Sequence, residues 1–323
     1  MIEYTPAILC GVIAGTVTRV LMLRTDTRQY PTRLHGKIIH IAMGLIAAAL
    51  GAIAIPSILK KDFSAITFLT LAATQFRDVR NMERNTLQQL DGYELVPRGN
   101  TYIEGIALVF ESRNYLAMLT SFATTFAYIG FRSWIAGVIM AIIAFFIAKT
   151  LMSGKRLHDL VDIEHVPLRF EGAGLYIDNI YIMNIGLPAR QEEIMKYGMG
   201  FILRPKSIDA MVTISNLGQR QAILHDVSVA LGIYRDSGTP ALVPLAKRDL
   251  EDGRVGIFVL PQDQDAEKAI GVIGNVPTLE SAVHMSSEAP KGREIRDDVR
   301  KCNSCSYYND PGEVCWWCPS IYL

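Results

Sequence analysis

Four cysteines near the end of the chain form the sharpest chemical pattern in the sequence. Cys302 and Cys305 make one CxxC pair, and Cys315 and Cys318 make a second pair after nine intervening residues. Four thiolates in two such knuckles suit tetrahedral zinc, so we expect a small structural zinc ribbon. Two alternatives stay open: disulfides, which require an oxidising compartment, and iron or redox chemistry.

Aromatic residues crowd the same tail. Tyr307, Tyr308, Trp316 and Trp317 lie between or beside the cysteines. A module of this size cannot cover so much aromatic surface, which predicts docking on the main domain or on a partner. The charged segment 286–300 that precedes it is typical of a linker or an exposed helix.

Two glutamates form a second candidate site, because they lie in or beside an apolar run. Glu104 and Glu111 are seven residues apart, so a continuous helix would place both on one face. A carboxylate at a bilayer is costly, and it indicates either a cavity or proton-handling site or an interfacial helix with solvated acids. Ion pairs of Glu111 with Arg113 or Arg132 would make burial tolerable.

Histidines and a carboxylate suggest a third site. His158, Asp162 and His165 would share one face of a helix, as a site with two histidines and one carboxylate requires. The solvated face of a juxtamembrane helix explains the same spacing, and we favour that interpretation.

One catalytic motif is partly present. Asp236-Ser-Gly238 resembles the short motif of aspartic proteases, in which two carboxylates share a proton and activate water. The sequence holds no second copy, and a turn between strands is the favoured interpretation. His225-Asp226 could belong to a hydrolase triad, but the sequence lacks the Gly-x-Ser-x-Gly elbow.

These residues must be positioned by a chain of two unequal halves. Half of the 323 residues are hydrophobic, a fifth are charged, and the net charge is zero. The apolar excess lies before Met152, which predicts a membrane part followed by a globular part. The neutral charge gives no support for nucleic-acid binding.

Five segments are expected to cross the bilayer, with the short third one the least certain. They are residues 5–23, 38–59, 63–76, 115–129 and 134–152. With five crossings, eleven lysines and arginines flank one side and three flank the other, so the amino terminus is expected outside and the globular part in the cytoplasm. The Gly11-xxx-Gly15 spacing and the small residues of the second segment predict close helix packing, possible also between copies of the chain.

The globular part mixes strand and helix patterns without a regular βαβ cycle, which predicts an α+β domain. We expect strands in residues 174–184, 211–214 and 256–260, and helices in residues 187–194 and 219–231.

The six residues Tyr102-Ile-Glu-Gly-Ile-Ala107 carry a resemblance to a known family. They spell the name of the YIEGIA proteins, multi-pass membrane proteins of endospore-forming bacteria. The resemblance implies a bacterial membrane protein with a link to sporulation, and it implies no reaction.

The sequence thus predicts a transmembrane domain (1–152), a cytoplasmic α+β domain (153–285) and a linker with the cysteine tail (286–323). The expected function is regulatory or scaffolding, with a cytoplasmic protein partner bound through the domain and the ribbon. The alternatives are a membrane-anchored protease or hydrolase, and an ion or proton pathway through Glu104 and Glu111.

Overall fold

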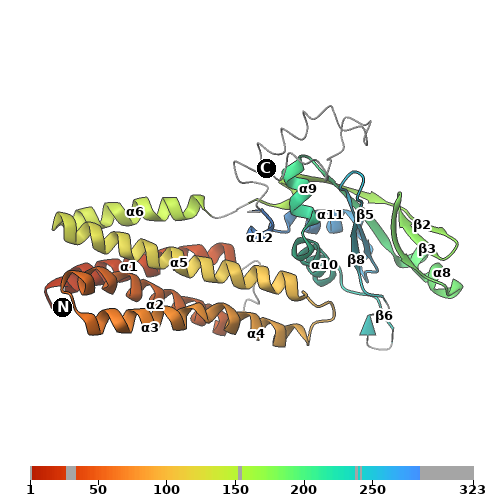
Figure 1. Cartoon of the computed structure of the whole chain (residues 1–323). Helices are drawn as coiled ribbons and strands as arrows, with labels where there is room; N and C mark the ends of the chain where they lie inside the picture. Colours follow the sequence, from red (N-terminus) through yellow and green to blue (C-terminus); the bar gives the residue numbers. More distant parts are fainter. Residues whose placement is uncertain (1, 27–33, 152–154, 237–238, 241, 284–323) are drawn as a thin grey trace, which may run out of the picture.

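A helical bundle and a second domain make up the protein, whose structure here is a computed structural model (Figure 1). The second domain combines helices with antiparallel sheets, as expected for the α+β class, and is called the α/β domain below. The structure describes residues 2–26, 34–151, 155–236, 239–240 and 242–283. The four tail cysteines and the segment 286–300 lie outside these residues.

The bundle contains six α-helices that follow a single turn of 3-10 helix, η1 (Ile2–Tyr4). They are α1 (Thr5–Asp26), α2 (Leu34–Leu59), α3 (Phe63–Arg77), α4 (Val79–Asp91), α5 (Asn100–Phe131) and α6 (Trp134–Thr150). Helices α1, α2 and α5 pack against one another, α6 packs on α5 and α1, and α3 packs on α2. Helix α5 runs the length of the bundle and reaches the α/β domain (Figure 1).

Small residues allow these helices to approach closely, as their spacing predicted. A Cβ atom added to Gly15 would lie 2.7 Å from the Ala117 carbonyl oxygen of α5 and 2.7 Å from the Ala48 Cβ of α2. Gly11 meets Thr125 of α5 in the same way. These small faces are therefore used within the chain, and an oligomer would need another surface.

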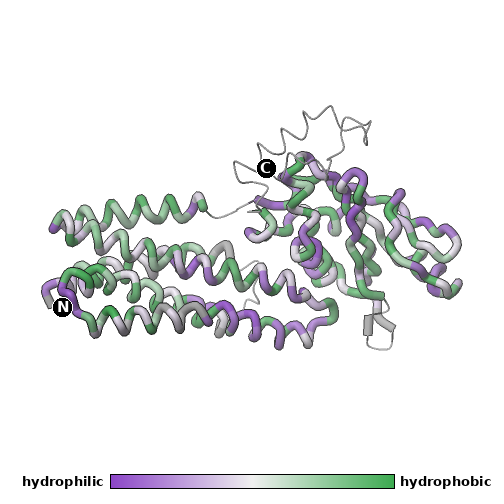
Figure 2. The backbone as a smooth tube through the Cα atoms, viewed as in Figure 1, coloured by the Kyte–Doolittle hydropathy of each residue, from purple (hydrophilic) through white to green (hydrophobic). Residues whose placement is uncertain are grey.

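Large apolar side chains lie on the outside of the bundle, while small and polar ones lie inside. Helix α6 is mostly green in Figure 2, and its buried residues are Gly137 and Ala148. Ser121 and Thr124, in contrast, are fully buried in α5. Such an arrangement suits a lipid solvent better than water.

Two helical segments, Thr5–Leu23 and Gly36–Leu59, are long and apolar enough to cross a membrane. The apolar segments Phe63–Ala72 and Trp134–Thr150 are shorter. The expected fourth crossing is part of the continuous helix α5, so the motif at residues 102–107 belongs to a helix that feeds it, not to a re-entrant loop. Five crossings stay a prediction.

The α/β domain is built on two antiparallel sheets. The larger sheet has the strand order β1-β5-β9-β8, from β1 (Val161–Val166), β5 (Met199–Pro205), β9 (Val255–Val259) and β8 (Leu245–Arg248). The smaller sheet has the order β2-β3-β4, from β2 (Leu168–Glu171), β3 (Gly174–Ile177) and β4 (Ile180–Asn184). A hairpin of two short strands, β6 (Arg235–Asp236) and β7 (Thr239–Pro240), is separate from both.

Six helices complete the described part of the domain. They are α7 (Leu157–Leu160), α8 (Pro188–Tyr197), α9 (Ile208–Ser215), α10 (Leu217–Leu231), α11 (Ala266–Asn275) and α12 (Glu280–Val283). Alternate residues of the central strand β5 serve two cores, because side chains alternate across a strand. Phe201 and Leu203 pack toward α10 and α11, whereas Ile202 packs toward the smaller sheet and α8.

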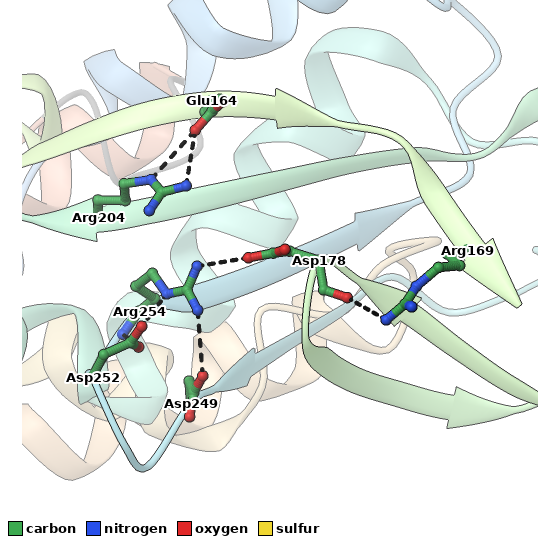
Figure 3. A network of polar contacts seen from close by, with 7 residues as sticks. All are labelled: Glu164, Arg169, Asp178, Arg204, Asp249, Asp252 and Arg254. Atoms are coloured by element: carbon green, nitrogen blue, oxygen red, sulfur yellow. Dashed lines mark hydrogen bonds and ion pairs between the residues drawn. The ribbon is translucent and has the colours of Figure 1, made fainter. Parts of the chain in front are cut away.

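Ion pairs join the two sheets at one end (Figure 3). The Arg254 guanidinium lies 2.8 Å from Asp178 of the β3–β4 turn and 3.7 Å from Asp249, and it also pairs with Asp252. Arg169 donates to the Asp178 carbonyl oxygen at 3.0 Å. Because Arg254 is mostly buried, this network fixes the orientation of the smaller sheet on the larger one.

Two local expectations were wrong. Residues 211–214 belong to helix α9, because Ser207 caps its start by accepting a hydrogen bond from the Ala210 amide at 3.1 Å. Residues 158–165 do not form one helix: α7 ends at Leu160 and β1 begins at Val161. His158, Asp162 and His165 therefore do not share a helical face.

Candidate functional site

The residues of the motif Tyr102–Ala107 lie where the bundle meets the α/β domain. Tyr102, Ile103 and Ile106 of α5 are almost fully buried in one hydrophobic core with residues of β5, β9, α10 and α11. Gly105 faces α12, since a Cβ atom added to it would lie 3.1 Å from the Ser281 hydroxyl. A helix of the bundle thus supplies part of the core of the domain.

Glu104 and Glu111 share one face of α5, as their spacing predicted, and this face meets α4. Glu104 pairs with Arg80, and its second oxygen lies 3.7 Å from the Arg84 guanidinium. Glu111 lies 3.7 Å from the Arg80 guanidinium, so its partner is neither Arg113 nor Arg132. The Glu104 side chain is 36% exposed, which favours the solvated alternative over an enclosed proton site.

Arg113 instead joins α5 to the end of the α/β domain. Its guanidinium donates to the Glu280 carboxylate of α12 at 2.9 Å, and their side chains are 5% and 16% exposed. The buried ion pair and the Gly105 contact together fasten α12 to α5.

Asn114, the residue after Arg113 on α5, faces the opposite way, into the bundle. Asn114 accepts a hydrogen bond from the Arg19 guanidinium of α1 at 3.1 Å, and the same guanidinium lies 3.1 Å from the His40 Nδ1 atom of α2. Arg19 is fully buried and lies over the Phe110 ring. Arg19 therefore lies inside the bundle and does not extend to its end, because Gly44 of α2 leaves room for the side chain there. The side chains of Arg19, His40 and Asn114 form what we call the bundle polar centre.

The loop between α4 and α5 docks on helix α10. Asp91 holds this loop by accepting hydrogen bonds from the Arg98 amide at 2.6 Å and the Gly99 amide at 3.1 Å. His225 of α10 lies 3.0 Å from the Val96 carbonyl oxygen. His225 thus has a structural partner at the junction, and no triad forms there among the described residues.

Replacing Asp226 with asparagine should stabilise the protein at neutral pH. Burial raises the pKa of this carboxyl from 3.8 to about 6, although the Arg98 guanidinium acts in the opposite direction. The folded state therefore takes up a proton between about pH 6 and pH 4 before the unfolded chain does, so stability falls as pH rises through this window. We expect Asp226→Asn to raise the Tm at pH 7.5 and to lose most of this advantage at pH 4.5.

Thermal unfolding of the detergent-purified protein at both pH values measures this difference. The control is Asp162→Asn, whose side chain is 72% exposed and should leave the Tm unchanged. An equal gain for Asp226→Asn at both pH values would contradict the burial argument.

The other residues that the sequence singled out lie elsewhere. Asp236 lies in the β6–β7 hairpin, paired with Thr239, and the connecting residues 237–238 lie outside the described part. His158 lies 3.0 Å from Asp159, while the His165 ring contacts Phe201. No group of three or more possible metal ligands occurs among the described residues, and Cys302, Cys305, Cys315 and Cys318 are not among them.

Sequence reasoning missed three residues: Arg80 and Arg84 of α4 as partners of the glutamates, and Asn114 in the bundle polar centre. The two arginines are four residues apart on an amphipathic helix, so they share one face of it. This basic face could have been matched to the acidic face formed by Glu104 and Glu111. Asn114 gave no such signal, since a single amide in an apolar helix indicates no direction.

Comparisons with known proteins agree with the expected family. The profile of the YIEGIA protein family matches residues 7–289, a range that ends before the tail cysteines. The protein YphB of Bacillus subtilis (strain 168) is 62% identical over 294 residues, which cover 91% of this chain and 99% of YphB. No solved structure matches the chain.

Proposed function

The chain belongs to the YIEGIA protein family of endospore-forming bacteria, and we propose that it is a multi-pass membrane protein with a regulatory or scaffolding role. In this proposal its α/β domain lies in the cytoplasm and binds a protein partner, with sporulation as the setting that the family suggests.

The observation that carries the proposal is the core shared by α5 and the α/β domain. Ile103 and Ile106 belong to the same helix as the bundle residue Asn114, so the domain cannot reorient freely relative to the bundle. A membrane-tethered enzyme needs only a flexible linker. A protein that presents a surface at a fixed height and angle, or that transmits a change across the junction, needs a rigid connection of this kind.

The directions in which successive helices run along the bundle support five crossings. Helices α1, α2, α3, α5 and α6 alternate in direction along the bundle, and the amino terminus lies at the end remote from the α/β domain (Figure 1). The connection with Lys60 and Lys61 follows α2 at that remote end. This placement accords with a cytoplasmic domain under the positive-inside rule.

Labelling of single cysteines tests the sidedness on which the proposal depends. In a chain whose Cys10 and four tail cysteines are all serines, Leu250→Cys, at a position 85% exposed, should react with a membrane-impermeant maleimide only after lysis. Lys60→Cys should react in intact cells. The reverse pattern would overturn a cytoplasmic partner.

Partner binding is tested by a photo-cross-linker at Met195, which is 54% exposed on α8. One predominant cytoplasmic protein should be captured in cells, and the same protein should bind the purified chain in detergent. Capture of lipid alone, or of nothing, would reject the scaffolding role.

An ion or proton pathway is a second candidate, and the observation that favours it is the placement of two carboxylates, Glu104 and Glu111, on one face of α5. If protons or ions cross the membrane by way of the Glu104 carboxylate, the Glu104→Gln variant should lose this transport. Because Glu104 is paired with Arg80 and partly exposed, we expect unchanged proton uptake by proteoliposomes and a stability cost of about 0–1 kcal/mol. Uptake that disappears only in the variant would favour the pathway instead.

We also propose that the tail binds one structural zinc ion. Metal analysis of the purified chain should give about one zinc per chain, because four thiolates complete one tetrahedral site. Cys302→Ser and Cys318→Ser should each lose the metal, whereas Cys10→Ser should keep it. Metal-free protein with disulfide-linked tail cysteines would contradict both the ribbon and the cytoplasmic location.

A further inference from the structure

A groove lies between helix α11 and strand β1, at one edge of the larger sheet. Its volume is about 420 Å³. Val161 and Ile163 line it from β1, and Ile270 lines it from α11. His158, Asp162 and Lys206 line it as well. His158 and Lys206 are each engaged in a hydrogen bond to a carbonyl oxygen, and the Lys206 ammonium lies 3.3 Å from the Asp162 carboxylate. The lining thus combines apolar side chains with charged ones that already have partners.

Strand β1 ends the sheet on this side. Within the described residues it pairs with β5 alone, in the order β1-β5-β9-β8. Its second edge can therefore accept a further strand. Val161 and Ile163 point to the core face, whereas Asp162 and Glu164 are exposed on the other face. A strand added here would place alternate side chains in the groove.

Glycines on α11 leave space for those side chains. A Cβ atom added to Gly271 would meet nothing within 4 Å. Gly274, three residues later, packs close to His158, with a distance of 3.3 Å from an added Cβ to the His158 Cβ. Helix α11 thus lies close to α7 at one end and leaves the groove open beside Gly271. An extended segment with apolar side chains two residues apart matches this shape.

We propose that the segment Ser320-Ile-Tyr-Leu323 of the same chain occupies the groove as an added strand. Ile321 and Leu323 are two residues apart, so an extended backbone directs both to one face. The described chain reaches Val283, only eight residues after the groove residue Asn275. The 36 residues from 284 to 319 can span up to about 120 Å when fully extended, so chain length does not restrict docking. Docking of the tail would also account for its surplus of apolar and aromatic side chains.

A photo-cross-linker at Gly271 tests the occupant in the full-length chain. The added side chain meets no neighbour there, so the substitution should not disturb folding. Irradiation of the detergent-purified protein should join position 271 to the peptide that contains Ile321 and Leu323. In a mixture of isotope-labelled and unlabelled chains, the cross-linked peptides should carry a single label, because the tail docks on its own domain.

Matched variants make the result decisive. The same cross-linker at Gly186, an exposed glycine that also has nothing within 4 Å of an added Cβ atom, should not capture the tail. The double change Ile321→Asp and Leu323→Asp should reduce capture at position 271 at least tenfold. Cross-linked peptides that join a labelled chain to an unlabelled one would show that the groove binds the tail of a second copy, which would overturn the proposal. Capture of another protein, or no capture of the tail, would also overturn the proposal.

Discussion

Ile103→Ala is expected to destabilise the α/β domain by about 2–5 kcal/mol, although Ile103 belongs to the helix that continues into the bundle. The side chain is fully buried and packs in the core that also contains Phe201 of β5 and Ile257 of β9. Removal of three carbon atoms leaves a cavity that this core can close only by moving α5 or the sheet. The penalty should therefore appear in the domain and in the bundle together.

Hydrogen exchange of the purified protein in detergent measures this effect strand by strand. In the Ile103→Ala protein, amides of β5 and β9 should exchange faster at the same pH and temperature, because exchange from a core strand reports global opening. Leu119→Ala is the control on the same helix, since Leu119 is 61% exposed on the outside of the bundle. If both variants leave β5 and β9 equally protected, the domain folds independently of α5 and the rigid connection does not exist.

The sequence predicted helices and their faces better than it predicted their neighbours. The seven-residue spacing of Glu104 and Glu111 placed both on one face of α5, and this was confirmed. The identity of the facing residues depends on how α4 folds back on α5, which no local pattern encodes. Arg113 was expected near Glu111, yet its partner Glu280 is 167 residues away in the chain.

Arg19 shows why burial of a charge is hard to predict from one helix. Taken by itself, an arginine near the end of an apolar segment is expected to extend its side chain to the membrane surface. The opposite outcome depends on Gly44 of a different helix, which lacks a side chain where Arg19 lies, and on Asn114, which accepts its hydrogen bond. Each of these residues is unremarkable alone, and only their assembly defines the bundle polar centre.

Strand and helix assignments in the domain failed where tertiary contacts or a cap outweighed local preference. The β-branched residues in 211–214 favour a strand, but Ser207 starts a helix before them. The helix expected around His158 stops after one turn, because residues 161–166 are recruited as the edge strand of the larger sheet. Helix α8, whose proline at the start was an unambiguous signal, was predicted correctly.

Glu280→Ala should cost about 3–5 kcal/mol, a large effect for one surface helix of four residues. The change removes the Glu280 carboxylate from beside the buried Arg113 guanidinium, and breaking an ion pair that is shielded from water costs far more than breaking a solvated one. The free energy of unfolding from denaturant titration should therefore fall sharply. The double change Arg113→Met and Glu280→Met removes both charges, and it should cost less than Glu280→Ala alone.

A second ion pair of the same chemistry separates burial from charge. Glu164 pairs with Arg204 at 3.1 Å, close to the 2.9 Å of the junction pair, but its side chains are 58% and 49% exposed. Glu164→Ala should therefore cost only about 0–1 kcal/mol, since water replaces the lost partner. The ratio of the two losses in unfolding free energy measures how completely water is excluded from the contact between α5 and α12. If Glu280→Ala costs no more than Glu164→Ala, water reaches the junction, and the α/β domain can pivot on the bundle despite the core that they share.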